Sequence, residues 1–143
     1  METVAALAVA VIIIAALVGM AIASLRSSNL SRSKAIGAQL LLEEIERVRI
    51  YRDTNTFSGL KLDLGLTTQT CPTVVGPLYV NSSQVVISGT ETVSSNNLSF
   101  SRSFSACLTD STYKVIEVSA TVTWTDSTGT HPVRSTTYFS DWR

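Results

Sequence analysis

The feature that most constrains this chain is an apolar run of twenty residues from Val4 to Ala23, which contains no charged or strongly polar side chain. About twenty such residues, rising about 1.5 Å each in a helix, span the hydrocarbon core of a bilayer, which is about 30 Å thick. A helix that is apolar on every face must lie in a bilayer or be surrounded by other helices. The run is also too long for the apolar region of a cleaved signal peptide. We therefore expect residues 1–23 to form a transmembrane or helix-core segment.

Glu2 places a carboxylate at the head of this run. A carboxylate there is costly in lipid unless it is paired, although a negative charge also suits the positive end of the helix dipole. The pattern M-E-T-V-A-A-L-A-V-A-V-I-I-I-A-A-L-V-G resembles the N-terminus of type IV pilins and type II secretion pseudopilins. In that family a glutamate opens the helix close behind the site cut by a prepilin peptidase. The resemblance implies that Glu2 pairs with the N-terminal amine of a neighbouring subunit in a filament.

The residues after the apolar run raise a question of membrane orientation. Arg26, Arg32 and Lys34 would keep the C-terminal side in the cytoplasm by the positive-inside rule. Members of the resembled family carry a few more residues before the glutamate and a basic leader ahead of the cleavage site. We expect such a leader to supply the topological signal before its removal, so that the rest of the chain is exported.

Residues 24–53 continue the helix in amphipathic form. No proline occurs from Ser24 to Arg52, and apolar residues recur at helical spacing on one stripe: Leu30, Ala38, Leu41, Ile45 and Val48. A helix of about 50 residues is therefore expected. Gly19 interrupts its apolar part, either loosening the helix or allowing a second helix to approach closely.

Charges in residues 24–53 occur in blocks. The blocks are Arg26, Arg32 and Lys34, then Glu43, Glu44 and Glu46, then Arg47, Arg49 and Arg52. One interpretation is a solvated helix face. The other is a set of inter-subunit charge blocks, in which staggered copies in a filament bring a basic block beside an acidic one and so set the register.

Residues 54–143 are expected to form an extracytoplasmic β-rich head domain. Glycine and proline make residues 54–76 irregular, although alternating leucines from Leu60 to Leu66 allow a short strand or a loop laid on the core. Strands are predicted at Tyr79–Ser88, Asn97–Leu108, Lys114–Trp124 and Val133–Phe139, with T-V-S-S-N-N as a turn and Gly129 in a hairpin loop. The fold class is thus α+β, a long helix packed on an antiparallel sheet, as in pilins.

The predicted strands alternate, so one face is apolar and the other polar. On the second predicted strand Arg102 interrupts the apolar face, and we expect it to lie at the rim. Cys107 falls on the polar face, 36 positions after Cys71. In an exported domain two such cysteines indicate a disulfide, which would staple the 54–76 connection onto the sheet.

Composition and motifs favour a structural role over catalysis. The formal net charge is zero, which gives no indication of nucleic-acid binding. His131, the single histidine, precedes Pro132 and is expected to be a surface turn residue. Zinc-ligand spacing, a P-loop and a nucleophile constellation are missing, so no enzyme activity, metal or cofactor is expected.

The resemblance implies a pilin or minor pilin of a type IV pilus-like filament, resting in the inner membrane before it is assembled on the cell surface. Its partners would be other pilin subunits, a prepilin peptidase, and an assembly ATPase with its platform protein. Adhesion, twitching motility and DNA uptake are roles that this architecture serves. The alternative is a single-pass membrane-anchored β domain that binds a partner without polymerising.

Overall fold

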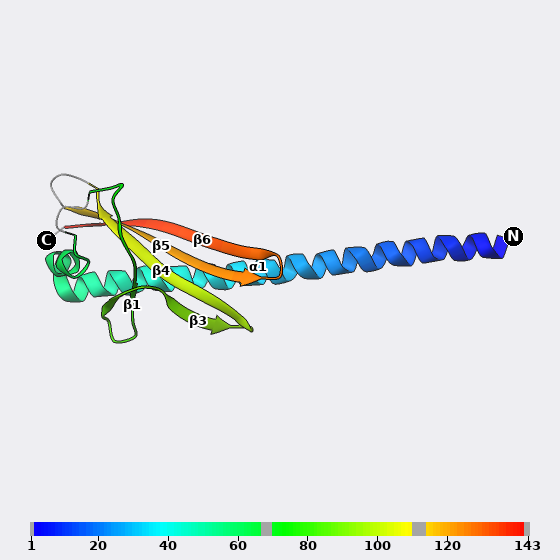
Figure 1. Ribbon diagram of the computed structural model, residues 1–143, viewed down its shortest axis with the longest axis horizontal. Coiled ribbons are helices and arrows are strands. Elements are labelled where there is room, and N and C mark those ends of the chain that lie inside the picture. The colour runs from blue at the N-terminus through cyan, green and yellow to red at the C-terminus, as the bar shows by residue number, and fades with distance from the viewer. Residues whose placement is uncertain (1, 67–69, 110–113, 142–143) are drawn as a thin grey trace. The chain divides into compact units, whose positions relative to one another are not determined.

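The structure is a computed structural model that describes residues 2–66, 70–109 and 114–141, without the side chains of residues 2 and 4–6. The chain divides into two units, Met1–Ala35 and Ile36–Arg143, each described by itself. Helix α1, Glu2–Asp63, makes up the described part of the first unit and continues into the second (Figure 1). The secondary structure is therefore one long helix followed by strands, as the α+β prediction required.

The end of α1 differs from the expected one. The helix is interrupted at Thr56, whose φ of 66° and ψ of 164° are non-helical, and it resumes up to Asp63. Leu60 and Leu62 therefore lie in the helix, and Leu64 and Leu66 in the turn and loop directly after it, so the alternating leucines do not form a strand. Leu60 in the helix and Leu64 in the turn after it, whose N–H donates to the Leu60 carbonyl at 3.0 Å, are both buried, and Leu62 between them is 74% exposed. In so short a run, leucines at every second position fit the two-residue period of a strand, and those four positions apart also fit one face of a helix. The sequence pattern alone was therefore ambiguous.

Gly65 terminates the helix. Its φ is +67°, the left-handed conformation that glycine adopts without a Cβ penalty. The Gly65 N–H donates to the Leu62 carbonyl and the Leu66 N–H donates to the Lys61 carbonyl, each at 2.9 Å. This pair of hydrogen bonds is the Schellman arrangement, which satisfies carbonyls that the helix end would leave unpaired.

The six strands form one antiparallel sheet in the order β2-β1-β4-β5-β6, with β3 also paired to β4. The bounds are β1 Val75–Val80, β2 Val86–Ser88, β3 Glu91–Ser95, β4 Leu98–Leu108, β5 Val115–Asp126 and β6 Gly129–Ser140. The second unit's part of α1, cyan to green in Figure 1, lies along one face of this sheet. The consecutive strands β4, β5 and β6 form the expected meander.

Two strand predictions were wrong in detail. The predicted strand Tyr79–Ser88 is a hairpin of β1 and β2, because the Asn81 carboxamide oxygen accepts the N–H groups of Ser83 and Val85 and so forms a turn. The predicted turn T-V-S-S-N-N contributes to β3, and only Asn96 and Asn97 turn the chain. Both have positive φ, 50° and 61°, as a two-residue hairpin of type I′ requires.

The core lies between the sheet and the amphipathic stripe of α1. Leu41, Ile45 and Val48 of the predicted stripe are buried there. The apolar face of β5 is buried as predicted, and its residues are Ile116, Val118, Ala120, Val122 and Trp124. Helix and sheet approach closely at Gly37, because a Cβ added to it would lie 2.9 Å from Cζ3 of Trp124. The helix can pack this closely only because residue 37 has no side chain.

Candidate assembly segment and buried charge cluster

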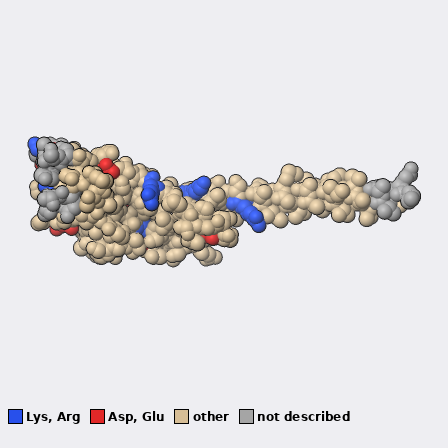
Figure 2. Space-filling model, turned by 45° about the horizontal axis from the view of Figure 1, so that its top comes forward, with Lys and Arg blue, Asp and Glu red and all other residues tan. Residues whose placement is uncertain are grey.

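The apolar stretch of α1 has the properties expected of a membrane or assembly segment. Its large side chains from Leu7 to Leu25 are between 47% and 69% exposed, and the helix is long and apolar enough to cross a membrane. Figure 2 shows its visible face without charged side chains between the grey end and the first blue side chain. A stretch that is apolar on every face needs a partner or a lipid phase to cover it.

The two predicted assembly residues lie in this stretch. Glu2 begins α1, and its side chain lies outside the described residues. Gly19 is helical, and a Cβ added to it would have no neighbour within 4 Å in this chain. The helix therefore continues through Gly19, and a second helix could approach closely there.

The predicted inter-subunit charge blocks divide into two groups. Arg26, Arg32 and Lys34 are exposed on the first unit. Glu46 is exposed and forms an ion pair with Arg49 at 2.6 Å, three positions along the same helix. These four residues lie on the helix surface, as both interpretations of the charge blocks require.

Glu44 corrects the prediction of a solvated or inter-subunit acidic block. It is fully buried in the second unit, where its Oε1 accepts a hydrogen bond of 3.0 Å from the Val80 N–H. A carboxylate enclosed in this way is available neither to water nor to a neighbouring subunit. Glu43, one position earlier, is 45% exposed and is bound within the same chain by Arg47 at 2.7 Å and Arg102 at 3.1 Å.

Arg102 is the residue that the sequence analysis misplaced. It is 2% exposed and lies inside the apolar face of β4, not at the rim. Its guanidinium forms two contacts with Glu91 Oε2, one of them a hydrogen bond of 2.6 Å from Nε. Its Nε also lies 3.4 Å from Glu44 Oε2. An arginine can remain in this face because carboxylates from α1 and β3 surround it.

Arg47 completes the group that we call the charge cluster, which consists of Glu43, Glu44, Arg47, Glu91 and Arg102. Arg47 donates a hydrogen bond of 2.9 Å to the Val80 carbonyl and lies 3.4 Å from Glu91. The cluster therefore joins α1 to β1, β3 and β4. A signal for it was present in the sequence, because Glu44 falls on the stripe of Leu41, Ile45 and Val48 and Arg102 on the apolar face of its strand.

The environment shifts the pKa values of three members. Burial raises the pKa of Glu44 and outweighs the hydrogen bond from Val80 and the attraction of Arg102. Burial also opposes ionisation of Glu43, but the hydrogen bond and charge of Arg102, with those of Arg47, hold its pKa below the ordinary value. Burial would lower the pKa of Arg102, but the hydrogen bonds to Glu91 and Glu43 raise it. The two neighbouring glutamates are thus shifted in opposite directions.

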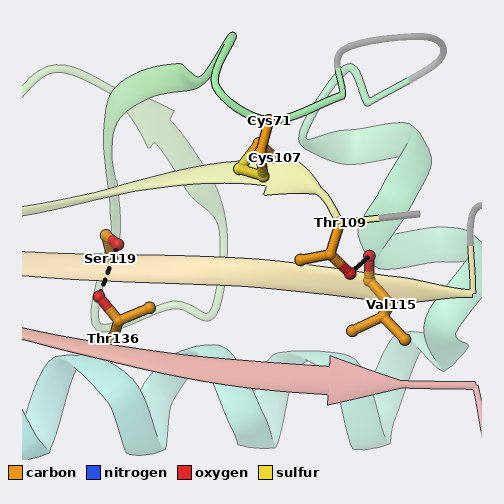
Figure 3. Close-up of a disulfide and its surroundings, with 6 residues drawn as sticks. All are labelled: Cys71, Cys107, Thr109, Val115, Ser119 and Thr136. Atoms are coloured by element: carbon orange, nitrogen blue, oxygen red, sulfur yellow. Dashed lines mark hydrogen bonds between the residues drawn. A yellow bond between two sulfur atoms is a disulfide. The ribbon is translucent and has the colours of Figure 1, made fainter.

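The disulfide joins the predicted pair. Cys71 and Cys107 are bonded, with their Cα atoms 5.3 Å apart. Figure 3 shows the bond on β4, with the chain around Cys71 passing over the sheet. The Cys71 N–H also donates to the Leu108 carbonyl at 2.9 Å. The connection that follows α1 is therefore held to the sheet covalently and by a backbone hydrogen bond.

His131 lies near the tip of the β5–β6 hairpin and stacks on Trp124, with the ring centroids 5.4 Å apart. Its Nε2 lies 3.0 Å from Thr128 Oγ1 and 3.1 Å from Asp126 Oδ1. A catalytic triad uses the two ring nitrogens for different partners, whereas here both partners contact Nε2. The hydrogen bonds from Thr128, side chain first and then backbone, lower the pKa of Asp126 to about 2. His131 is therefore a partly buried residue of β6, paired with Trp124, and not the surface turn residue that was predicted. Its contacts with Thr128 and Asp126 hold the hairpin turn beside it.

Comparison with known proteins found no match to this chain. No protein-family model matches the chain, and no curated protein or solved structure matches it. The functional argument therefore rests on the residues and their geometry.

Proposed function

We propose that this chain is a pilin-like subunit, a pilin or minor pilin, of an extracellular type IV pilus-like filament, assembled through its N-terminal helix. One observation carries the proposal: the two parts of α1 have opposite surroundings. The stretch from Leu7 to Leu25 is apolar and exposed, whereas the part from Leu41 to Leu60 is packed into a disulfide-bonded domain. The first part therefore needs an external cover, which would be the inner membrane before assembly and neighbouring subunits' helices afterwards.

Glu2 would set the register of assembly. In the filament it would pair with the N-terminal amine of a neighbouring subunit, as the resemblance to pilins implies. A buried ion pair offsets the cost of desolvation only if its geometry is good, so its main effect would be specificity rather than net stability. A prepilin peptidase would prepare that amine, and an assembly ATPase with its platform protein would supply the energy.

The experiment that tests this proposal is substitution of Glu2 in the native host. We expect Glu2→Ala to leave membrane insertion intact, because the apolar stretch is unchanged, and to reduce the yield of sheared filaments. Thr3→Ala is the matched control, since it truncates the adjacent side chain without removing a charge. Immunoblots of the membrane and sheared fractions, with intact mass and N-terminal peptide mapping, give the readout.

A processed start near Met1 together with filament loss in Glu2→Ala would support the proposal. Filament yield equal to that of the wild type would contradict it. An unprocessed start with all of the protein in the membrane fraction would favour the alternative, a single-pass anchor whose β domain binds a partner without polymerising.

A further inference from the structure

The charge cluster contains more carboxylates than guanidinium groups. Three carboxylates, those of Glu43, Glu44 and Glu91, face two guanidinium groups, those of Arg47 and Arg102. If every member were ionised, the cluster would carry one uncompensated negative charge. An uncompensated charge is tolerable at a surface but costly in an interior.

The distribution of contacts shows which carboxylate is least compensated. Glu91 receives two contacts from Arg102 and one from Arg47, and Glu43 receives one from each arginine. Glu44 receives only the Val80 N–H on Oε1 and the Arg102 Nε at 3.4 Å from Oε2, a contact that is not a hydrogen bond. Glu44 is also the deepest of the three, with none of its side chain exposed. The least compensated carboxylate therefore has the least access to water.

We propose that the second unit, residues 36–143 and called the head from here on, holds a buried proton-binding site, the carboxyl group of Glu44, and that the head is most stable while a proton is bound there. The proton removes the excess charge and leaves two carboxylates for two guanidinium groups. The inference concerns the head alone and does not depend on filament assembly.

The charged and titratable groups that face Glu44 come from three elements. Arg47 is on α1 with it, Glu91 is on β3 and Arg102 is on β4, while β1 contributes the Val80 backbone. Burial and the Glu91 charge favour the protonated form, and the other groups oppose it. The pKa of Glu44 is therefore raised, so its stabilising contribution is complete below the unfolded value of 4.5 and is lost as pH rises through the folded pKa.

Glu43 has the opposite dependence. Its pKa is lowered, so its contribution is present above the unfolded value of 4.5 and is lost as pH falls through the folded pKa. The stability of the head should accordingly fall at both ends of the pH range. Ionisation of Glu44 causes the alkaline limb of this profile, and protonation of Glu43 causes the acid limb. Substituting Glu44 should remove only the alkaline limb, which separates this proposal from general acid denaturation.

The deciding measurement is an NMR titration of the full chain in non-ionic detergent micelles. With ¹³C-labelled glutamate, the Cδ resonance of Glu44, assigned through the backbone, should titrate above 4.5 and above that of Glu43. Titration of Glu44 at or below 4.5 would overturn the proposal, and no variant is needed for that result.

A variant supplies the second measurement. Glu44→Gln keeps an acceptor for the Val80 N–H and replaces the protonated oxygen with a neutral amide of similar size. We expect the urea midpoint of the wild type to fall as pH rises above 4.5 through the folded pKa of Glu44, and that of Glu44→Gln to stay constant over the same range. Glu46→Gln, on the exposed face, should retain the wild-type slope. A Glu44→Gln slope equal to that of the wild type would refute the site.

Discussion

Arg102 shows at the residue scale how a charged side chain is accommodated within an apolar face. It is 2% exposed, and it is stable there because Glu43, Glu44 and Glu91 supply its partners. Removing the arginine would leave the partly buried Glu91 without its main partner, whereas removing both partners would leave an apolar contact. We therefore expect the cluster to specify one alignment of α1 on the sheet more than to add net stability.

We expect Arg102→Met to lower the free energy of unfolding of the head by about 3–5 kcal/mol. The double variant Arg102→Met with Glu91→Met should recover part of this loss, since the carboxylate that makes most of the contacts of Arg102 is then absent. Urea denaturation of the full chain in detergent micelles, followed by tryptophan fluorescence, gives both values. Equal losses in the single and double variants would show that packing, and not charge, holds this position.

Gly37 is a residue whose role depends on its neighbour across the core. In an isolated helix Gly37→Ala would stabilise by up to about 1 kcal/mol. Here the new Cβ would meet the Trp124 ring at 2.9 Å, so we expect a net loss of about 1–2 kcal/mol in the head. Gly19→Ala is the control, because its Cβ would have no neighbour within 4 Å in this chain. Thermal denaturation should separate the two, and a higher melting temperature for Gly37→Ala would be inconsistent with this packing.

At the scale of elements, the interruption of α1 at Thr56 is bridged by a hydrogen bond. Tyr51, before the break, donates its hydroxyl to Asp63 Oδ2 at 2.5 Å, and Asp63 is the last residue of the helix. The Tyr51 ring is buried in the core while Asp63 is exposed. This hydrogen bond therefore holds the last turns of α1 to its longer part, across the non-helical backbone at Thr56.

We expect Tyr51→Phe to cost about 1 kcal/mol, because the ring is kept and one hydrogen bond is lost. That hydrogen bond raises the pKa of Tyr51 from 10.0 to about 12, so its contribution is complete below pH 10.0 and is lost as pH rises towards 12. Alkaline unfolding followed by circular dichroism should therefore show a smaller loss of stability over this range in Tyr51→Phe. Tyr138→Phe, at an exposed position of β6, should behave as the wild type.

At the scale of the whole molecule, the chain separates an apolar segment from a folded head. The apolar surface of the first unit needs an external cover, whereas the second unit buries its own apolar face. A charge introduced into either unit should therefore affect a different property.

We expect Ile13→Arg to disfavour bilayer integration by about 2.5–3.5 kcal/mol, the cost of arginine near the middle of a membrane helix, while the head still folds. Leu62→Arg is the matched control, because Leu62 is an exposed leucine of the head and should leave integration unchanged. Alkaline carbonate extraction of membranes measures both. Integration of Ile13→Arg at the wild-type level would argue against a membrane-spanning role for this stretch.

The sequence by itself determined the structural features that follow from local patterns of residues. A proline-free run with helical spacing defined α1, and strict alternation defined the buried face of β5. Such patterns are readable because the periods of helix and strand are properties of the backbone. The pairing of Cys71 with Cys107 followed from there being only two cysteines.

Only the tertiary structure decided where the residues that break these local patterns lie and what they contact. Glu44 and Arg102 looked like surface charges on separate elements, 58 positions apart by their numbers, and only packing of α1 on the sheet brings them together. The same holds for Gly37, whose neighbour Trp124 is distant in sequence. The length of α1 also escaped the local pattern, because the spacing of Leu60, Leu64 and Leu66 suits both a strand and a helix. The energy of these contacts depends on which elements face each other, and a periodicity within one element does not contain that information.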